Sequence, residues 1–237
     1  MSAARRWRID LHVHTEASYD CLSPVDAVVR TARARGLDRL AITDHNAIEG
    51  ALAASRIDRA LVIVGAEMKT AEGIDVTGLF LREPVPRGLP AVETARAIRE
   101  QGGLVYLPHP FAGGKGAGAE LLETLAPWID VVEVFNARIH RRALNERAAA
   151  WARAHARPGG AGSDAHTLDE IARAVVEVPP FDGRDGFLDA LRAGRVVGSS
   201  SGPHVHLFST WAKWRKAWTR AGGRRPTMTP RGGRRRG

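Results

Sequence analysis

Histidine and carboxylate residues gather in five short clusters, each at or just after an apolar run of the sequence. The clusters hold Asp10, His12 and His14; Asp44 and His45; Glu67; His109; and Asp164 and His166. Imidazole nitrogens and carboxylate oxygens are the ligands that zinc-like and other divalent metal ions take from proteins. Each cluster alone has a structural alternative, such as a solvated strand face, a turn or a buried histidine. Chance alone does not explain five such clusters at the ends of apolar runs, so the pattern predicts a site for more than one metal ion.

The spacing inside the clusters indicates which side chains share a face. Residues two apart in a strand project to the same side, so His12 and His14 can reach one ion, and the last cluster repeats that spacing. Asp44 and His45 are neighbours and face opposite ways in a strand. We therefore expect Asp44, and likewise Asp10, to stand behind the ligands as hydrogen-bond partners that orient them.

Apolar runs alternate with amphipathic patterns along the first 200 residues, which predicts repeated strand–helix units. We expect strands over residues 9–13, 40–43, 61–65, 74–81, 104–107, 131–135 and 160–162, with weaker patterns at 175–178 and 196–197. Helical patterns cover residues 24–35, 47–59, 91–101, 119–126, 141–154 and 186–193. Seven such units favour an α/β fold of the TIM-like barrel type over an open doubly wound sheet, because no glycine-rich nucleotide fingerprint follows a strand. The C-terminal strand ends of a barrel meet on one face, where the clusters would converge.

The clusters also carry a family resemblance. The motifs DLHVHT, TDHN, GAE, PHP and GSDAH, in this order, resemble those of the polymerase-and-histidinol-phosphatase (PHP) family of metal-dependent phosphoesterases. The segments GLVYLPHPF and VVEVFNAR resemble a bacterial branch of that family. The resemblance covers about residues 7–200. It implies a distorted seven-stranded (β/α)7 barrel with two or three divalent ions at the C-terminal ends of its strands.

The resemblance implies a ligand set for each metal ion. One ion takes His12, His14, Glu67 and Asp164; a second shares Glu67 as a bridge and adds His109; and a third takes Asp20, His45 and His166. Asp75 stands where many relatives have a histidine that completes the second set, so we include it as a ligand. Because the set has no thiolate, it suits Mn, Fe or Zn and does not choose among them.

These residues predict an enzyme that hydrolyses phosphate esters with a water activated by the metals. Within the set, we expect Glu67, Asp164 and His166 to be catalytic. Arg138 follows another strand, and with Asn136 it is expected to bind the substrate phosphate, because a guanidinium matches phosphate oxygens. A surface arginine at a helix start is the alternative. The expected substrates are small phosphomonoesters, including nucleotides, or the ends of short oligonucleotides.

Two other functions fit parts of the sequence. A metal-dependent amidohydrolase would share the barrel and the activated water, and Lys69 is the nearest candidate for a carbamylated lysine between its metals. A protein of low activity could instead act by binding nucleic acid or an anionic surface through its basic C-terminal segment. The complete ligand set favours the phosphoesterase.

Basic residues are concentrated in the last part of the sequence. There are 35 basic and 26 acidic residues, yet ten of the basic ones and no acidic one lie between Trp211 and Gly237. The rest of the sequence is therefore almost neutral. The single cysteine, Cys21, excludes a disulfide framework, and we expect a cytoplasmic protein without a signal peptide or a membrane span.

The composition predicts three parts: a barrel domain over residues 1–200, a connector and basic, tryptophan-containing helix over 201–221, and a disordered Arg/Gly tail over 222–237. On a helix, one arc holds Trp211, Trp214 and Trp218, and the opposite side holds Lys213, Lys216 and Arg220. One interpretation is that the tryptophans dock on the barrel while the basic residues face water. The other is weak binding of nucleic acid or an anionic surface.

Overall fold

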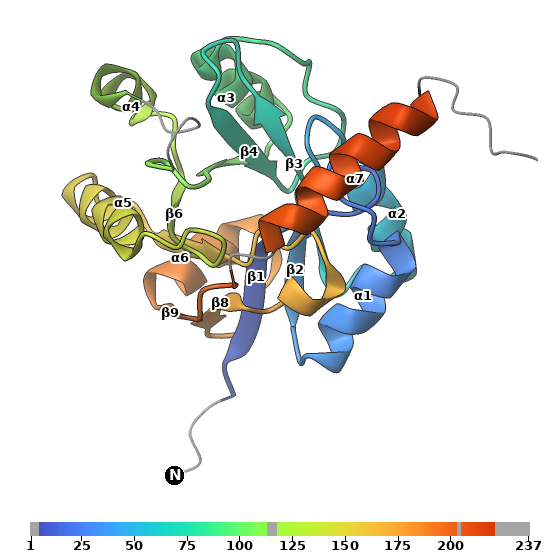
Figure 1. Cartoon of the computed structure of the whole chain (residues 1–237). Coiled ribbons are helices and arrows are strands. Elements are labelled where there is room, and N and C mark those ends of the chain that lie inside the picture. The colour runs from blue at the N-terminus through green and yellow to red at the C-terminus, as the bar shows by residue number, and fades with distance from the viewer. Residues whose placement is uncertain (1–4, 113–117, 203–204, 221–237) are drawn as a thin grey trace, which may run out of the picture.

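The computed structural model describes residues 5–112, 118–202 and 205–220, and in that part of the chain nine strands form one curved sheet (Figure 1). The strands are β1 (Trp7–Val13), β2 (Arg39–Ile42), β3 (Val62–Lys69), β4 (Asp75–Leu79), β5 (Leu104–Leu107), β6 (Val131–Asn136), β7 (Gly159–Gly162), β8 (Ala174–Val178) and β9 (Arg195–Gly198). The helices are α1 (Val25–Ala34), α2 (Glu49–Ile57), α3 (Ala91–Glu100), α4 (Ala119–Leu125), α5 (Arg142–Ala154), α6 (Gly183–Arg192) and α7 (Val205–Arg220), with a 3-10 turn at Leu168–Glu170.

The two ends of the sheet approach each other and nearly close a barrel. The strands follow the order β7-β6-β5-β4-β3-β2-β1-β8-β9. Beyond the end of β7, Ala165 pairs with Val13 of β1, and the amide of His14 donates to the carbonyl of Ala165 over 2.9 Å. β1 therefore has β2 on one side and both β8 and the segment after β7 on the other. The result is an α/β fold with a nearly closed, TIM-like barrel, as the sequence predicts.

The barrel departs from the prediction in the number and direction of its strands. The expected seven strands are nine among the described residues, because the two weaker patterns form β8 and β9. Four of the strand pairings are antiparallel, including both pairings of β4. Only five residues join β3 to β4, which is too short for the crossover that parallel strands require. The chain therefore turns back there as a hairpin.

Apolar burial holds the helices against the sheet. α1 begins after Pro24 and ends before Gly36, whose φ of +71° suits a glycine. Its Val28 and Ala32 are buried in one apolar cluster with Ile42 of β2. This packing fixes the position of the strands whose carboxyl ends carry the histidine and carboxylate clusters.

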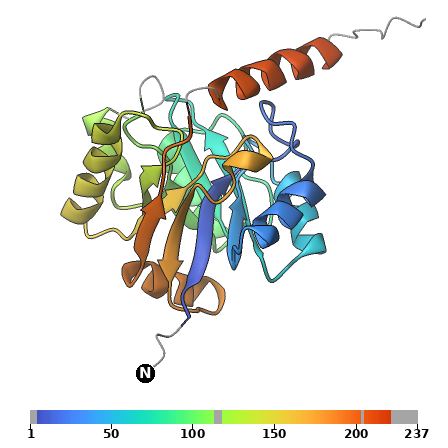
Figure 2. The same ribbon diagram turned by 60° about the horizontal axis from the view of Figure 1, so that its bottom comes forward.

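α7 lies across the end of the barrel (Figures 1 and 2). The exposed fractions of Trp211, Trp214 and Trp218 are 51%, 67% and 48%. The side chain of Lys216 instead donates to the carbonyl oxygens of Glu16 and Ser18. Docking of the tryptophans on the barrel was therefore the wrong interpretation. The loop after β1 offers two carbonyl oxygens to this helix, and the lysine ammonium, with three N–H donors, satisfies both, whereas an indole ring has a single donor.

The structure describes the C-terminal part of the sequence as far as residue 220. α7 supplies the helix predicted within residues 201–221. The predicted disordered tail over residues 222–237 lies outside the described residues. Within the ranges that the structure describes, no helix combines the length and the apolar character needed to cross a bilayer.

Candidate metal centre

All nine predicted metal ligands lie in one connected cluster at the end of the barrel where the parallel strands finish, and all but His12, His14 and Asp75 line one pocket there. His12 lies in β1, His14 and Asp20 in the loop after it, His45 after β2, Glu67 in β3, Asp75 at the start of β4, His109 after β5, and Asp164 and His166 after β7. All of them are buried except Asp164, whose side chain is 17% exposed. Segments far apart in the sequence therefore converge, as the strand ends of a barrel do.

The β3–β4 hairpin explains how Asp75 reaches this pocket although it stands at the start of a strand. Because β4 runs against its neighbours, its first residue lies at the carboxyl ends of the parallel strands, opposite Lys69 of β3. Nζ of Lys69 lies 3.3 Å from Oδ1 of Asp75. Glu67 lies inside β3 and not beyond its end, since the hairpin extends this strand past the apolar run that indicated it.

Two loops hold candidate ligands in backbone conformations that residues other than glycine seldom adopt. The φ angle is +29° at His109 and +53° at Asp164. Pro108 and Pro110 restrict the chain on either side of His109. The amide of His109 also donates to Oε2 of Glu133 over 2.7 Å. Such strain persists only where surrounding contacts enforce it, and it concentrates at functional sites.

Glu67 is the centre of the cluster. Its Oε1 lies 3.0 Å from Nε2 of His109. Its Oε2 lies 3.2 Å from both Nε2 of His12 and Nδ1 of His45, and 3.4 Å from Nε2 of His14. The carboxylate is fully buried, so each oxygen faces its own set of imidazole rings. A carboxylate shared by two cations needs this arrangement.

His12, His14 and Asp164 form a second group beside Glu67. The Nε2 atoms of the two histidines lie 3.1 Å apart. Oδ1 of Asp164 lies 3.7 Å from the first of these nitrogens and 3.4 Å from the second. Two imidazole nitrogens and a carboxylate oxygen at these distances favour a cation among them.

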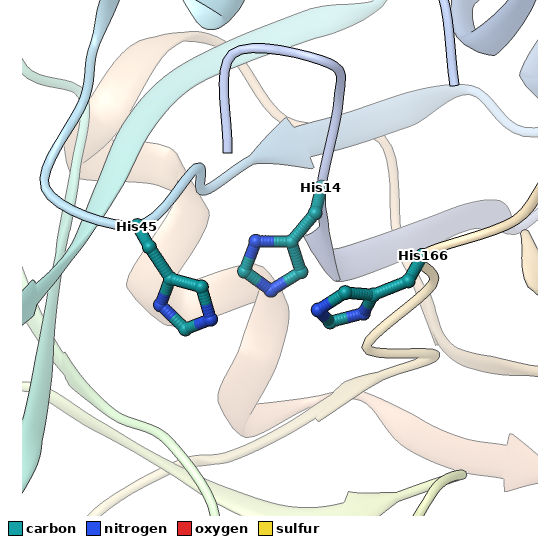
Figure 3. Close-up of side chains that lie close together, drawn as sticks. All are labelled: His14, His45 and His166. Carbon is teal, nitrogen blue, oxygen red and sulfur yellow. The ribbon is translucent and has the colours of Figure 1, made fainter. Parts of the chain in front are cut away.

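Asp20, His45 and His166 form a third group. Oδ2 of Asp20 lies 3.4 Å from Nε2 of His45 and 3.3 Å from Nε2 of His166. Figure 3 shows the rings of His14, His45 and His166 turned toward a shared space from three segments of the chain. The third predicted ligand set is thus brought together next to the first.

The donor set fits divalent metal ions. Among the described atoms, Nδ1 of His14 and Nδ1 of His109 are buried without a hydrogen-bond partner. A buried polar atom without a partner costs free energy, which a bound ligand can offset. The only thiol of the sequence, Cys21, is not in the cluster, so the donors are imidazole nitrogens and carboxylate oxygens, as Mn, Fe and Zn accept.

The surroundings of His14 and Glu67 shift the pKa values of these two residues toward ligand-competent states. Burial, with the charge of His166, lowers the pKa of His14 to about 3. Burial opposes ionisation of Glu67, but the charges of His45 and His12 hold the pKa of this carboxyl well below its usual range. Metal ions bind neutral imidazole and ionised carboxylate, so both groups stand ready to ligate.

Asp10 and Asp44 stand behind the ligands, where they hold the backbone rather than imidazole rings. Asp10 accepts hydrogen bonds of 2.9 Å from the amides of Ser163 and Ala172. Asp44 accepts hydrogen bonds of 2.6 Å from both the amide and the hydroxyl of Thr15. Burial raises the pKa of each carboxyl to about 6. The two aspartates thus fix the loops that carry the ligands.

Glu133 of β6, which sequence reasoning missed, orients His12. Its Oε1 lies 3.0 Å from Nδ1 of His12 and accepts a 3.0 Å hydrogen bond from the hydroxyl of Tyr106. Its Oε2 accepts a 2.9 Å bond from Nδ2 of Asn136. The signal was a single acid in the apolar run Val-Val-Glu-Val, because a charge in a buried strand needs partners.

Arg138 and Asn136 line the pocket as expected, but the guanidinium already has partners in the protein. Nε of Arg138 lies 3.2 Å from Oε1 of Glu170, and Nη1 lies 2.6 Å from Nδ1 of His166. Nη2 donates to the hydroxyl of Ser209 in α7 over 3.2 Å. Arg138 therefore joins the third group of ligands to α7, in addition to facing the pocket.

A cavity of about 330 Å³ opens over the cluster, and α7 forms one of its walls with Ser209, Thr210 and Lys213. Nζ of Lys213 lies 3.7 Å from Oδ2 of Asp20. It also lies 5.3 Å from the ring centre of Tyr19. Sequence reasoning missed Lys213 as a site residue, because a helical pattern does not tell which side of the helix meets the barrel.

Sequence comparison assigns this site to a family. The family model of the PHP domain matches residues 10–146, and a PHP-associated model matches residues 142–196. The chain belongs to the PHP domain family. The two matches together contain all nine candidate ligands, whereas α7 lies beyond them.

Three related sequences share about a third of their aligned residues with this PHP chain. An uncharacterised protein of Methanocaldococcus jannaschii is 36% identical over 143 residues, which is 55% of this chain and 82% of that protein. A second protein of the same organism is 32% identical over 175 residues, 72% of this chain and 70% of that protein. A 5′-3′ exoribonuclease of Haemophilus influenzae is 35% identical over 101 residues, 40% of this chain and 36% of that protein.

Solved structures share the fold at low sequence identity. A two-domain Bacteroides vulgatus protein with a predicted PHP-like metal-dependent phosphoesterase superposes with a TM-score of 0.69 at 18% identity, over 82% of this chain and 65% of that one. PsfC from Pseudomonas syringae gives 0.66 at 19% identity, over 89% and 99%. An amidohydrolase from Chromobacterium violaceum with bound sulfate gives 0.55 at 19%, over 67% and 87%. At these identities the likeness concerns the PHP fold alone.

Proposed function

We propose that the chain is a metal-dependent phosphoesterase, a hydrolase that cleaves phosphate esters with water. The observation that carries this proposal is the surroundings of Glu67, whose two buried oxygens lie 3.0 and 3.2 Å from different imidazoles. A carboxylate in this position suits two divalent ions about 3.5 to 4 Å apart, as in many phosphatases. Membership of the PHP family supports the same class of reaction.

We assign the ligands to the sets that the family resemblance implies. These are His12, His14, Glu67 and Asp164; Glu67 and His109 with Asp75; and Asp20, His45 and His166. In the structure, ligand atoms of Asp75 lie within 4.8 Å of those of Glu67 and His45. When bound, two or three Mn, Fe or Zn ions would lower the pKa of water toward neutrality and offset the charge of a phosphoryl group. We assign the catalytic roles to Glu67, Asp164 and His166, which line the cavity and would hold these ions.

Residues of the chain would bind and orient the ester itself. Lys213, whose side chain is 46% exposed, stands at the cavity as the cation best placed to meet a phosphate oxygen. Arg138 adds positive charge to the lining of the cavity. Nδ2 of Asn136 donates a 3.3 Å hydrogen bond to Oδ2 of Asp164 and so positions this carboxylate. A cavity of about 330 Å³ is the size of small-ligand pockets. This supports small phosphomonoesters, nucleotides or the end of an oligonucleotide as substrates.

The test is hydrolysis by the full-length protein after metal removal and reloading with Mn, Fe or Zn. We expect phosphate release from p-nitrophenyl phosphate, nucleoside monophosphates or a 5′-phosphorylated oligonucleotide, and loss of that activity with a chelator. His155→Gln is the matched control, because His155 pairs with Glu123 at the surface and away from the cavity. Hydrolysis of amide substrates without any phosphate release would overturn the proposal in favour of an amidohydrolase.

A further inference from the structure

Within the described residues, five of the eight exposed large apolar side chains lie on α7. They are Leu207, Phe208, Trp211, Trp214 and Trp218, and they form what we call the aromatic face of α7. Their exposed fractions run from 48% at Trp218 to 72% at Leu207. Exposed apolar residues are normally scattered singly, so a stripe along one helix marks a contact surface.

The opposite side of α7 is the side that packs against the barrel, so the aromatic face is not needed for that packing. Val205 and Ala212 are buried against the protein. Lys216 donates to carbonyl oxygens of the loop after β1, and Arg138 donates to the hydroxyl of Ser209. Figure 2 shows the helix along the end of the barrel, clear of the sheet and of the other helices. Rotation of the helix to bury its tryptophans would break these contacts.

The charge around the aromatic face indicates the chemistry of its partner. The guanidinium of Arg215 lies 5.4 Å from the ring centre of Trp211, between the exposed rings. Ten basic residues and no acidic one occur from Trp211 to Gly237. A second copy of the chain would bring two such segments together, and they would repel each other. The partner is therefore anionic.

A lipid surface fits the aromatic face better than a nucleic acid. Tryptophan favours the boundary between headgroups and acyl chains, and Leu207, which has no ring to stack on a base, gains only from hydrocarbon. Proteins that bind nucleic-acid strands line a groove with several lysines and arginines beside the stacking rings. On α7, Arg215 lies beside Trp211, whereas Lys213 and Lys216 contact the barrel. We propose that the aromatic face of α7 docks the protein on an anionic phospholipid bilayer, with Arg215, which lies beside the Trp211 ring, toward the headgroups.

Co-sedimentation of the full-length protein with vesicles tests this docking. One set of vesicles is phosphatidylcholine alone, and the other contains about one third phosphatidylglycerol to supply negative charge. The protein binds the anionic vesicles, its tryptophan emission shifts to the blue, and added salt weakens the binding. The triple variant Trp211→Ala/Trp214→Ala/Trp218→Ala loses affinity about 30-fold or more, since the buried ring area is removed. Ile57→Ala is the matched control, because Ile57 is 54% exposed on α2 and off this face.

Several outcomes would overturn the docking. The first is that the protein does not bind anionic vesicles at low salt, and the second is that the triple variant binds them as well as the wild type does. The third is that the protein binds polyuridylate or a second copy of itself through the tryptophans but does not bind vesicles. Light scattering detects the second copy. If the triple variant does not fold by circular dichroism, Trp214→Glu at the 67% exposed position replaces it, and wild-type affinity in this variant counts against the proposal.

Discussion

Nδ1 of His12 lies 3.0 Å from Oε1 of Glu133, which turns the other ring nitrogen toward Glu67. The same carboxylate accepts hydrogen bonds from the hydroxyl of Tyr106 and the amide of His109. One buried side chain therefore fixes the ring orientation of one candidate ligand and the loop position of another. Partners of this kind behind metal ligands control the affinity for the metal.

Glu133→Gln is expected to weaken metal binding by about 10- to 100-fold, because a neutral amide no longer fixes the tautomer of His12. Competition with a chelator measures the affinity. Glu123→Gln is the matched control, since Glu123 pairs with His155 at the surface. Equal affinities in the two variants would show that Glu133 does not support the ligands.

Glu67→Gln is expected to abolish turnover and to remove metal from two positions, because both oxygens of this carboxylate face candidate ligands. His109→Ala is expected to empty mainly one position. Elemental analysis gives the metal content, and circular dichroism verifies that each variant is folded. A folded Glu67→Gln protein with wild-type metal content and rate would contradict the shared position.

Lys213→Ala is expected to raise KM for phosphate esters about tenfold or more with little change in kcat, because a charged hydrogen bond contributes about 1.5 to 3 kcal/mol. Lys213→Arg should recover part of the loss. Arg215→Ala is the control on the same helix, since Arg215 stacks on Trp211 and does not line the cavity. Equal KM values for both alanine variants would remove Lys213 from substrate binding.

Metal binding is expected to weaken as the pH falls. Burial opposes protonation of His12, His45 and His109, yet Asp164 and Glu67 raise the pKa of these histidines above the ordinary 6.5. Protons therefore compete with metal for these nitrogens at pH 6.5 and above, and metal uptake releases them. Calorimetry in two buffers of different ionisation enthalpy measures the protons released. An affinity independent of pH through this range would contradict the assignment of the histidines as ligands.

Gly162→Ala is expected to destabilise the protein by about 3 kcal/mol or more, because overpacking at a rigid contact is not relieved. A Cβ atom there would lie 2.2 Å from Cβ of His12 and 3.0 Å from its backbone nitrogen. Urea unfolding measures the loss. Gly118→Ala is the control, because a Cβ at Gly118 meets none of the described atoms within 4 Å. Unchanged stability in Gly162→Ala would show that β1 and β7 separate more easily than their contact indicates.

Local patterns predicted the residues that local geometry controls. The two-residue spacing of His12 and His14 was sufficient, because side chains alternate along a strand and both rings approach Glu67. The strand count was wrong because the two weaker patterns form β8 and β9, and the direction of β4 was missed for a different reason. Alternation of strands and helices indicates parallel units, but the direction of β4 depends on the length of the turn before it.

Other parts of the site depend on tertiary structure. Glu133 resembles an interruption in an apolar strand until the fold places Tyr106 and His12 against it. Lys213 and Asp20 are far apart in the sequence, and they meet only because α7 crosses the end of the barrel. No periodicity within either segment encodes that contact.

Arg138 contacts His166 through Nη1 and the carbonyl of Val205 and hydroxyl of Ser209 through Nη2, so one side chain bonds both the ligand cluster and α7. When two binding sites are coupled through a shared side chain, a ligand at either site changes the affinity of the other site by the same factor. If an ester in the cavity strengthens the contacts between α7 and the barrel, it would change the affinity of the aromatic face of α7 for its partner by some factor. A partner on that face would then change the affinity for the ester by the same factor. Binding of the ester and docking of α7 would in that case be coupled through one guanidinium.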